Sequence, residues 1–241
     1  MPSNKKTRSR ERTQLKQSID GGTNSYNVRS IHVRQSFNWD CGLACAEMAM
    51  KCANQSEIST IKPDSTPLTP FTHGEPLWTI ELYMGMRQRG FNVEMSTSVK
   101  GVNTNHINID FYKKTVGADI DTVARINDKF KDVDAMGWDV LDAIPTSALP
   151  DLLHDKSTLC AVVLVNWYVI ASRNMLYPEF FGHCILLTGY DNSTSRFTYL
   201  DPLLGPATKS VCKNVFDAAR VYPGTDMDMI VVHPTTIYKE L

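Results

Sequence analysis

The sequence predicts an α+β domain in which a central N-terminal helix packs on a mainly antiparallel sheet. Helical patterns dominate up to about residue 153 and strand patterns dominate after it, as expected for the α+β class rather than for alternating βαβ units. The chain has 241 residues and a net charge of −1, which suits one well-buried soluble domain. We place this domain at residues 28–241 and find no internal repeat.

Residues 1–27 are expected to form a disordered basic tail. The segment 4–16, NKKTRSRERTQLK, contains six lysines and arginines against one glutamate and almost no apolar residues. We interpret it as a solvated tail, with a nuclear address or an RNA contact as the alternative. Apart from this tail, the near-zero charge gives no reason to expect a nucleic-acid partner.

No signal peptide is recognised in the sequence, and the longest apolar run, residues 159–165, is too short to cross a bilayer. We therefore expect a cytoplasmic protein without a membrane partner, and the basic tail allows the nucleus as a second location. The six cysteines include no CxxC pair and are expected to be reduced thiols. The sequence does not indicate an oligomeric state.

The central helix is expected at residues 41–53. Residues 30–35, SIHVRQ, alternate like a half-buried strand, and FNWD then breaks that pattern. Asp40 is placed to cap the helix that follows. Polar residues in the helix fall on a single stripe, so most of its circumference is predicted to be packed.

The remaining N-terminal elements are mostly helical. Residues 56–76 contain four prolines with many Ser and Thr and predict a long surface loop. Residues 76–90 predict an amphipathic helix that ends at Gly90, and residues 91–98 predict a strand. The pattern from 103 to 153 is helical with breaks at glycine and proline.

The C-terminal third predicts the sheet. Residues 159–170 form a continuous apolar run, typical of a strand covered on both faces. Residues 183–191 and 196–202 flank the polar turn DNSTS and predict a hairpin. A short helix at 215–220 and a last strand at 228–233 complete the domain.

This hairpin brings a histidine and a carboxylate together. If the turn centres on Asn192, residues whose numbers sum to 384 face each other, so His183 is predicted opposite Asp201. A bulge would shift this register by one residue. Asp191, at the hairpin tip, is about 26 Å along the strand from His183 and is too far away to orient its ring.

Cys41 is the candidate nucleophile because a cysteine at a helix N-terminus is favoured as a thiolate. His183 would then act as general base and acid, and Asp201 would orient it. The backbone N–H of Cys41 and the side-chain amide of Gln35 would stabilise an oxyanion. Two alternatives remain at this point: an inert core cysteine, or a zinc site made of Cys41, Cys45 and His183.

Other residues carry weaker signals. Trp39 and Trp78 are interpreted as core residues, with the lining of a substrate cleft as the alternative. The acidic pairs DID (119–121) and DMD (226–228) are interpreted as caps or solvated turns rather than metal ligands. The chain has neither the G-x-x-x-x-G-K-[ST] nor the G-x-G-x-x-G pattern, so no cofactor is expected.

Several segments resemble known families. The combination of Gln35, Asp40-Cys41-Gly42, Ala44, His183 and Asp201-Pro202 is similar to papain-like cysteine proteases, and more closely to bacteriocin-leader-processing peptidase domains. A still closer resemblance, from about residue 28 to 235, is to the guanylyl cyclase domain-containing family of plants and animals. It rests on WDCGLAC (39–45), LWTIEL (77–82), GVN (101–103), FYKK (111–114), AVVLVN (161–166), GHCILLTGYD (182–191) and FDAARVYPGTDMDMIVV (216–232).

These resemblances imply different activities. The protease likeness implies a papain-like fold and a cysteine-dependent hydrolase with a Cys41–His183–Asp201 triad, acting on a peptide, isopeptide or related amide of a peptide or protein substrate. The family name implies instead a guanylyl cyclase that converts GTP to cyclic GMP with Mg²⁺ or Mn²⁺. A third hypothesis is a catalytically silent module whose cleft only binds a partner.

Overall fold

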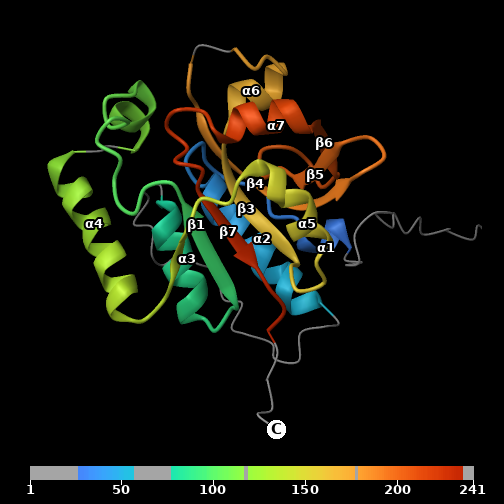
Figure 1. Cartoon of the computed structure of the whole chain (residues 1–241), viewed down its shortest axis with the longest axis horizontal. Helices are drawn as coiled ribbons and strands as arrows, with labels where there is room; N and C mark the ends of the chain where they lie inside the picture. The colour runs from blue at the N-terminus through green and yellow to red at the C-terminus, as the bar shows by residue number, and fades with distance from the viewer. Residues whose placement is uncertain (1–26, 57–76, 117–118, 177–178, 236–241) are drawn as a thin grey trace, which may run out of the picture.

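A computed structural model describes residues 27–56, 77–116, 119–176 and 179–235. Within them, the strands form one seven-stranded sheet in the order β2-β1-β7-β3-β4-β5-β6 (Figure 1). All neighbouring strands are antiparallel except β1 and β2. The strands are β1 (Val93–Thr97), β2 (Val140–Asp142), β3 (Cys160–Asn166), β4 (Gly182–Asp191), β5 (Arg196–Leu200), β6 (Lys209–Cys212) and β7 (Met229–Val232). This confirms the α+β class and the mainly antiparallel sheet.

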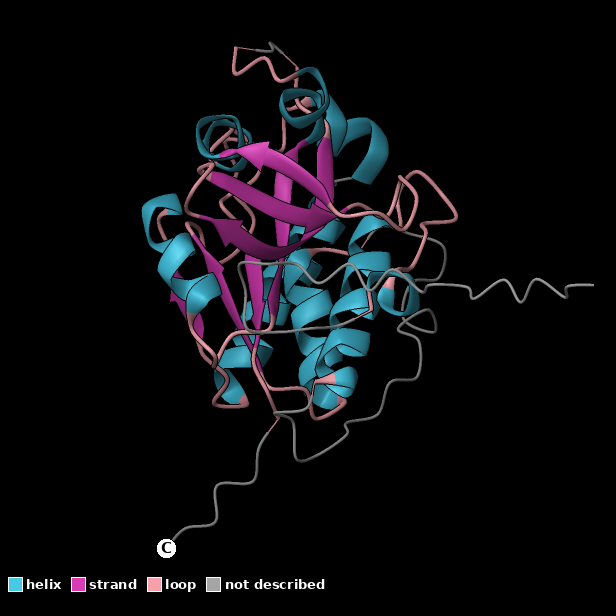
Figure 2. Ribbon diagram, turned by 90° about the vertical axis from the view of Figure 1, so that its right-hand side faces the viewer, coloured by secondary structure: helices cyan, strands magenta, loops and turns pink. Residues whose placement is uncertain are grey.

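Helices lie on both sides of the sheet (Figure 2). The helix α2 passes behind the central strands in the view of Figure 1, whereas α5, α6 and α7 pack on the opposite face. The helices are α1 (Val28–Ile31), α2 (Cys41–Gln55), α3 (Thr79–Gln88), α4 (Ile120–Ala135), α5 (Leu149–His154), α6 (Trp167–Ser172) and α7 (Lys213–Arg220), with a π-helix at Tyr112–Val116 and a 3-10 helix at Thr146–Ala148. The predicted central helix is therefore confirmed.

The two helical layers enclose two apolar cores that share the sheet. On β3, Cys160 and Val162 face the core beneath α2, whereas Ala161 and Val163 face the core beneath α7. All four side chains are at most 1% exposed. Successive side chains of a strand point to opposite faces, so an uninterrupted apolar run is what a strand covered on both sides requires.

Three element predictions were wrong in part. Residues 30–35 are not a strand: α1 ends at Ile31 and the following residues lead into α2. The run 159–170 is strand only to Asn166, because the side chain of Asn166 accepts a hydrogen bond from the Tyr168 N–H and caps α6. The helical pattern from 103 to 153 also contains the short strand β2, which pairs in parallel with β1.

The predicted hairpin is present with a different register. Leu186 pairs with Leu200, and beyond an irregularity at Thr188 the pairing shifts so that Gly189 faces Thr198. The numbers of facing residues thus sum to 386 near the open end and 387 near the turn, rather than 384. Near the open end the shift is two residues, which keeps the side chains there on the predicted face, whereas near the turn it is three.

The basic tail and nearly all of the proline-rich loop at 56–76 lie outside the described residues, so both remain predictions. The proposed domain boundary at residue 28 is likewise untested. No helix in the described part of the chain is both long enough and apolar enough to cross a membrane.

Candidate active site

Cys41 is the first residue of α2, and the helix start is left uncapped. The carboxylate of Asp40 turns back to accept the N–H groups of Ser36 at 2.9 Å and Phe37 at 3.1 Å. The prediction that Asp40 caps the helix with its side chain was therefore wrong, because the preceding loop uses both of its oxygens. The first-turn N–H groups of α2 consequently gain no hydrogen bond from this carboxylate, and they favour negative charge next to Cys41.

His183 and Asp201 form a buried pair at the open end of the β4–β5 hairpin. His183 Nε2 lies 2.9 Å from Asp201 Oδ1, and the same oxygen accepts the N–H of Leu203 at 2.9 Å. The two side chains are 2% and 0% exposed. The ring of Trp167 packs on the imidazole with centroids 4.8 Å apart. The contact predicted between His183 and Asp201 is thus present.

The hydrogen bond to Asp201 occupies Nε2 and leaves Nδ1 of His183 for Cys41. Burial opposes a charge on His183, but hydrogen bonds to Asp201 and Cys41 together with the negative charges of both outweigh it and raise the pKa of His183 to about 9. The pKa of Cys41 is lowered well below its ordinary value by a hydrogen bond from the Cys184 thiol, against the effect of burial, and by the hydrogen bond and charge of His183. The favoured state is a thiolate–imidazolium pair.

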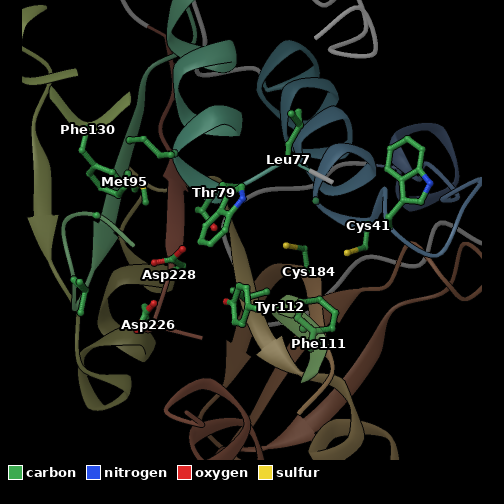
Figure 3. A pocket seen from close by; sticks show the side chains of 18 residues that line it. Cys41, Leu77, Thr79, Met95, Phe111, Tyr112, Phe130, Cys184, Asp226 and Asp228 are labelled. Carbon is green, nitrogen blue, oxygen red and sulfur yellow. The ribbon is translucent and has the colours of Figure 1, made fainter. Parts of the chain in front are cut away.

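Cys184 is a site residue that sequence reasoning missed. It follows His183 directly on β4, and its side chain lies next to that of Cys41, with which it forms a hydrogen bond (Figure 3). The hydrogen bond with Cys41, burial and the charge of Cys41 raise the pKa of Cys184, so it keeps its proton and donates it. The signal available in sequence was only its position next to the histidine.

The other buried thiols differ from Cys41. Burial raises the pKa of Cys45, whose Sγ donates to the Cys184 carbonyl at 3.2 Å. A hydrogen bond with Cys52 and burial raise the pKa of Cys160. Cys41 is therefore the cysteine whose surroundings favour a nucleophile.

A cavity of about 80 Å³ opens beside Cys41. Trp39 and Trp78 line it, whereas core packing was the favoured interpretation from sequence, and Phe111, Tyr112 and Phe130 extend its aromatic wall. Trp78 and Tyr112 have ring centroids 5.5 Å apart. Cys41 and Cys184 lie at one end of the cavity, and Asp226 and Asp228 lie at the other (Figure 3).

Asp226 and Asp228 precede β7 in a loop that neighbouring segments hold in place. Asp226 accepts Asn103 Nδ2 at 2.8 Å and lies 3.0 Å from His106 Nδ1, and its backbone carbonyl accepts the Ser98 N–H at 2.8 Å. Burial raises the pKa of Asp228 to about 7, partly offset by hydrogen bonds from Thr97 and Thr79.

The two acidic pairs noted in the sequence therefore differ. Asp119 of the DID pair accepts the Thr122 N–H at 2.8 Å and caps α4, in agreement with the sequence interpretation. The DMD pair, Asp226 and Asp228, is not a solvated turn but the polar end of the cavity. Only the tertiary structure places this loop against α3 and β1.

Gln35 lies near the site without lining the cavity. Its backbone N–H donates to the Pro202 carbonyl at 2.9 Å, next to Asp201, and its amide nitrogen donates to the Phe37 carbonyl at 2.7 Å. The side-chain oxygen is buried without a partner. Its role as an oxyanion donor remains a prediction.

The site does not have the composition of a metal centre. Among the described residues, no group of three or more His, Cys, Asp or Glu side chains is arranged to hold a metal ion. Cys41, Cys45 and His183 therefore do not form the zinc site considered from sequence.

Two comparisons relate the chain to known proteins. A family model described as guanylylate cyclase matches residues 31–232. The chain is also similar to a protein of Arabidopsis thaliana named Guanylyl cyclase 1, with 24% identity over 225 residues, which are 84% of this chain and 74% of the plant protein. The range matched by the family model includes both ends of the cavity and the His183–Asp201 pair.

Proposed function

The chain belongs to the guanylylate cyclase family. From the contacts among a cysteine, a histidine and an aspartate, we propose that it acts as a cysteine-dependent hydrolase of a peptide, isopeptide or related amide. The observation that carries this proposal is the environment of Cys41, where an uncapped helix start, His183 and Cys184 all favour the thiolate. Activated thiolates of this kind are nucleophiles in acyl transfer.

The proposed reaction has two steps, the acylation of Cys41 and the hydrolysis of the resulting thioester. The Cys41 sulfur attacks the amide carbon, and the oxyanion that forms accepts N–H groups at the start of α2. The His183 imidazolium gives its proton to the leaving amine, and the thioester remains on Cys41. His183 then takes a proton from water, which attacks the thioester, and the acid leaves as the thiolate re-forms. Asp201 holds the ring throughout.

The test is the pH dependence of Cys41 alkylation by iodoacetamide, followed by mass spectrometry of the peptide that contains Cys41. We expect the rate to reach its plateau well below the midpoint of an ordinary thiol of about 8.5. A library of fluorogenic peptide and isopeptide amides would then reveal turnover that Cys41→Ala abolishes. A Cys41 midpoint equal to that of free cysteine would refute the proposal.

The family name supports a second candidate, a guanylyl cyclase, in which the 3′-oxygen of GTP attacks the α-phosphorus and pyrophosphate leaves. The cavity is a poor fit for this substrate. Its charged side chains, within the described residues, are Asp226 and Asp228, and no lysine or arginine lines it to receive phosphates. Two carboxylates that already accept hydrogen bonds do not make the cradle that metal-bridged phosphates require.

The cyclase candidate is tested by incubating the protein with GTP and either Mg²⁺ or Mn²⁺ and measuring cyclic GMP by mass spectrometry. Cyclic GMP formation that persists in Cys41→Ala would establish the cyclase and separate it from the thiol chemistry. A yield equal to that of a heat-inactivated control with both metals would remove it.

A further inference from the structure

The cavity beside Cys41 has an unusual distribution of charge. Its walls are aromatic and aliphatic, and no lysine, arginine or histidine lines it in the described part of the chain. The carboxyl groups of Asp226 and Asp228 stand at the end opposite the sulfur (Figure 3). A group that enters this cavity therefore passes apolar side chains and meets negative charge at its far end.

Asp228 lacks a cationic partner. In the described residues no ion pair joins it to a lysine, arginine or histidine, and hydrogen bonds from Thr97 and Thr79 act on its carboxyl group. The buried Arg220 attracts Asp228 from outside the cavity, but its guanidinium donates to the Thr146 hydroxyl and the Met227 carbonyl. A carboxylate that is largely withdrawn from water without a matched cation is costly, and an incoming cation relieves that cost.

The loop that carries the two carboxylates is held in place before any ligand arrives. Tyr112 donates to the Gly224 carbonyl, and Ser98 contacts the Asp226 carbonyl through both its backbone N–H and its hydroxyl. The carboxylate of Asp226 already contacts the side chains of Asn103 and His106, so Asp228 has more capacity to accept a new hydrogen bond. A cation would thus meet a preformed site.

We propose that the substrate of this site carries a protonated amine or guanidinium that pairs with Asp228 and Asp226, while its apolar stem lies between Trp78, Tyr112 and Phe130. A chain with a basic end group and several methylene groups, such as a lysine or arginine side chain, has this chemistry. The inference rests on the proposed function, since it assumes that the bond to be cleaved reaches Cys41.

A matched series of chloroacetamides tests the charge preference. N-(4-aminobutyl)-, N-pentyl- and N-(4-carboxybutyl)-2-chloroacetamide share one electrophile and similar arms but end in a cation, a methyl group and an anion. In each, the Cys41 sulfur attacks the CH₂ carbon and chloride leaves. Rates at Cys41 are measured above pH 7, where Asp228 is ionised, by mass spectrometry and are divided by the rates of free cysteine with the same reagents.

We expect the normalised rate of the cationic reagent to exceed that of the anionic reagent by about tenfold or more, because opposite charges attract strongly in a site of low dielectric. Asp228→Asn should bring this ratio close to one, and Asp226→Asn should lower it. Asp134→Asn, which removes an exposed carboxylate from α4, is the control and should leave the ratio unchanged.

Equal normalised rates for the cationic and anionic reagents in the wild-type protein would overturn the inference. So would a preference that survives both Asp228→Asn and Asp226→Asn. The N-pentyl reagent separates this result from the proposed function: its pH profile reports the thiolate at Cys41 whatever the charge preference is. If Asp228→Asn does not fold, Asp226→Asn still provides the test.

Discussion

Oδ1 of Asp201 is fixed from two directions, by Nε2 of His183 at 2.9 Å and by the Leu203 N–H at 2.9 Å. The carboxylate therefore cannot rotate without losing a bond to its own chain. Because the ring of His183 is held by this oxygen and covered by Trp167, its second nitrogen keeps one direction, toward Cys41. The orientation of the His183 ring is thus part of the fold.

Asp201→Asn should lower hydrolytic turnover by about 10²–10⁴-fold, the range of a general acid–base contribution. The amide keeps an acceptor for Nε2 but removes the charge that helps raise the pKa of His183. Initial rates on the best amide substrate provide the measurement. Retention of full activity would show that Asp201 only supports the turn.

Turnover should be highest between two pH limits, which are the pKa values of Cys41 and His183. Cys41 has a lowered pKa and His183 has a pKa raised to about 9, so the thiolate–imidazolium pair exists between these two values. As the pH rises through about 9, His183 loses the proton that the leaving amine needs, and turnover should fall. Alkylation, which needs only the thiolate, should not fall there, and a common decline of both rates would contradict the assignment.

Cys184→Ala should raise the pKa of Cys41, because the hydrogen bond from the Cys184 thiol is the largest cause of its lowering. Cys184→Ser keeps a donor and should restore part of the effect. The midpoint of iodoacetamide alkylation against pH measures both. Cys160→Ala, which empties a buried site on β3, is the matched control and should leave the midpoint unchanged.

Asp228→Asn should stabilise the protein increasingly as the pH rises from about 4 to about 7. The native pKa of about 7 lies above the usual 3.8, so the folded state holds a proton that the unfolded state has lost in this interval, and stability falls with rising pH. The free energy of unfolding of the variant should exceed that of the wild type by at most about 4 kcal/mol at pH 8. This difference should vanish near pH 4. Urea unfolding at both pH values measures it. A difference that is independent of pH would show that Asp228 does not titrate in this way.

Gly182→Ala should destabilise the fold by about 1–3 kcal/mol, the usual cost of overpacking. An added Cβ would lie 2.8 Å from Cε1 of Phe111 and 3.3 Å from Cζ of Phe180. Gly182 directly precedes His183, so the same change should also slow Cys41 alkylation. Gly205→Ala, where an added Cβ meets nothing within 4 Å, provides the control.

The sequence predicted the contact between His183 and Asp201 better than the strand register that produces it. The pairing near the open end differs from the predicted one by two residues, and because side chains alternate with a period of two, His183 and Asp201 still share a face and meet diagonally. The irregularity at Thr188 lies next to Gly189, an isolated glycine of the kind that accompanies bulges, but the sequence does not give the size of the shift. Alternation therefore gave the correct face where counting from the turn gave the wrong partner.

The polar end of the cavity could not be predicted from local sequence patterns. Asp226 and Asp228 lie in a short loop that looks like an ordinary acidic turn, and their neighbours Ser98, Asn103 and Thr79 come from distant segments. Likewise, the uncapped start of α2 depends on Asp40 turning toward Ser36 rather than following its strong local preference for capping. Tertiary contacts decide both features.

The placement of β7 constrains how this protein is made. The strand enters the sheet between β1 and β3, although both are synthesised well before it. Until residues 226–232 leave the ribosome, β1 with β2 and β3 with its partners are two separate ribbons with exposed edges. The acidic end of the cavity lies on the same segment, so the sheet and this cavity both depend on one late part of the chain.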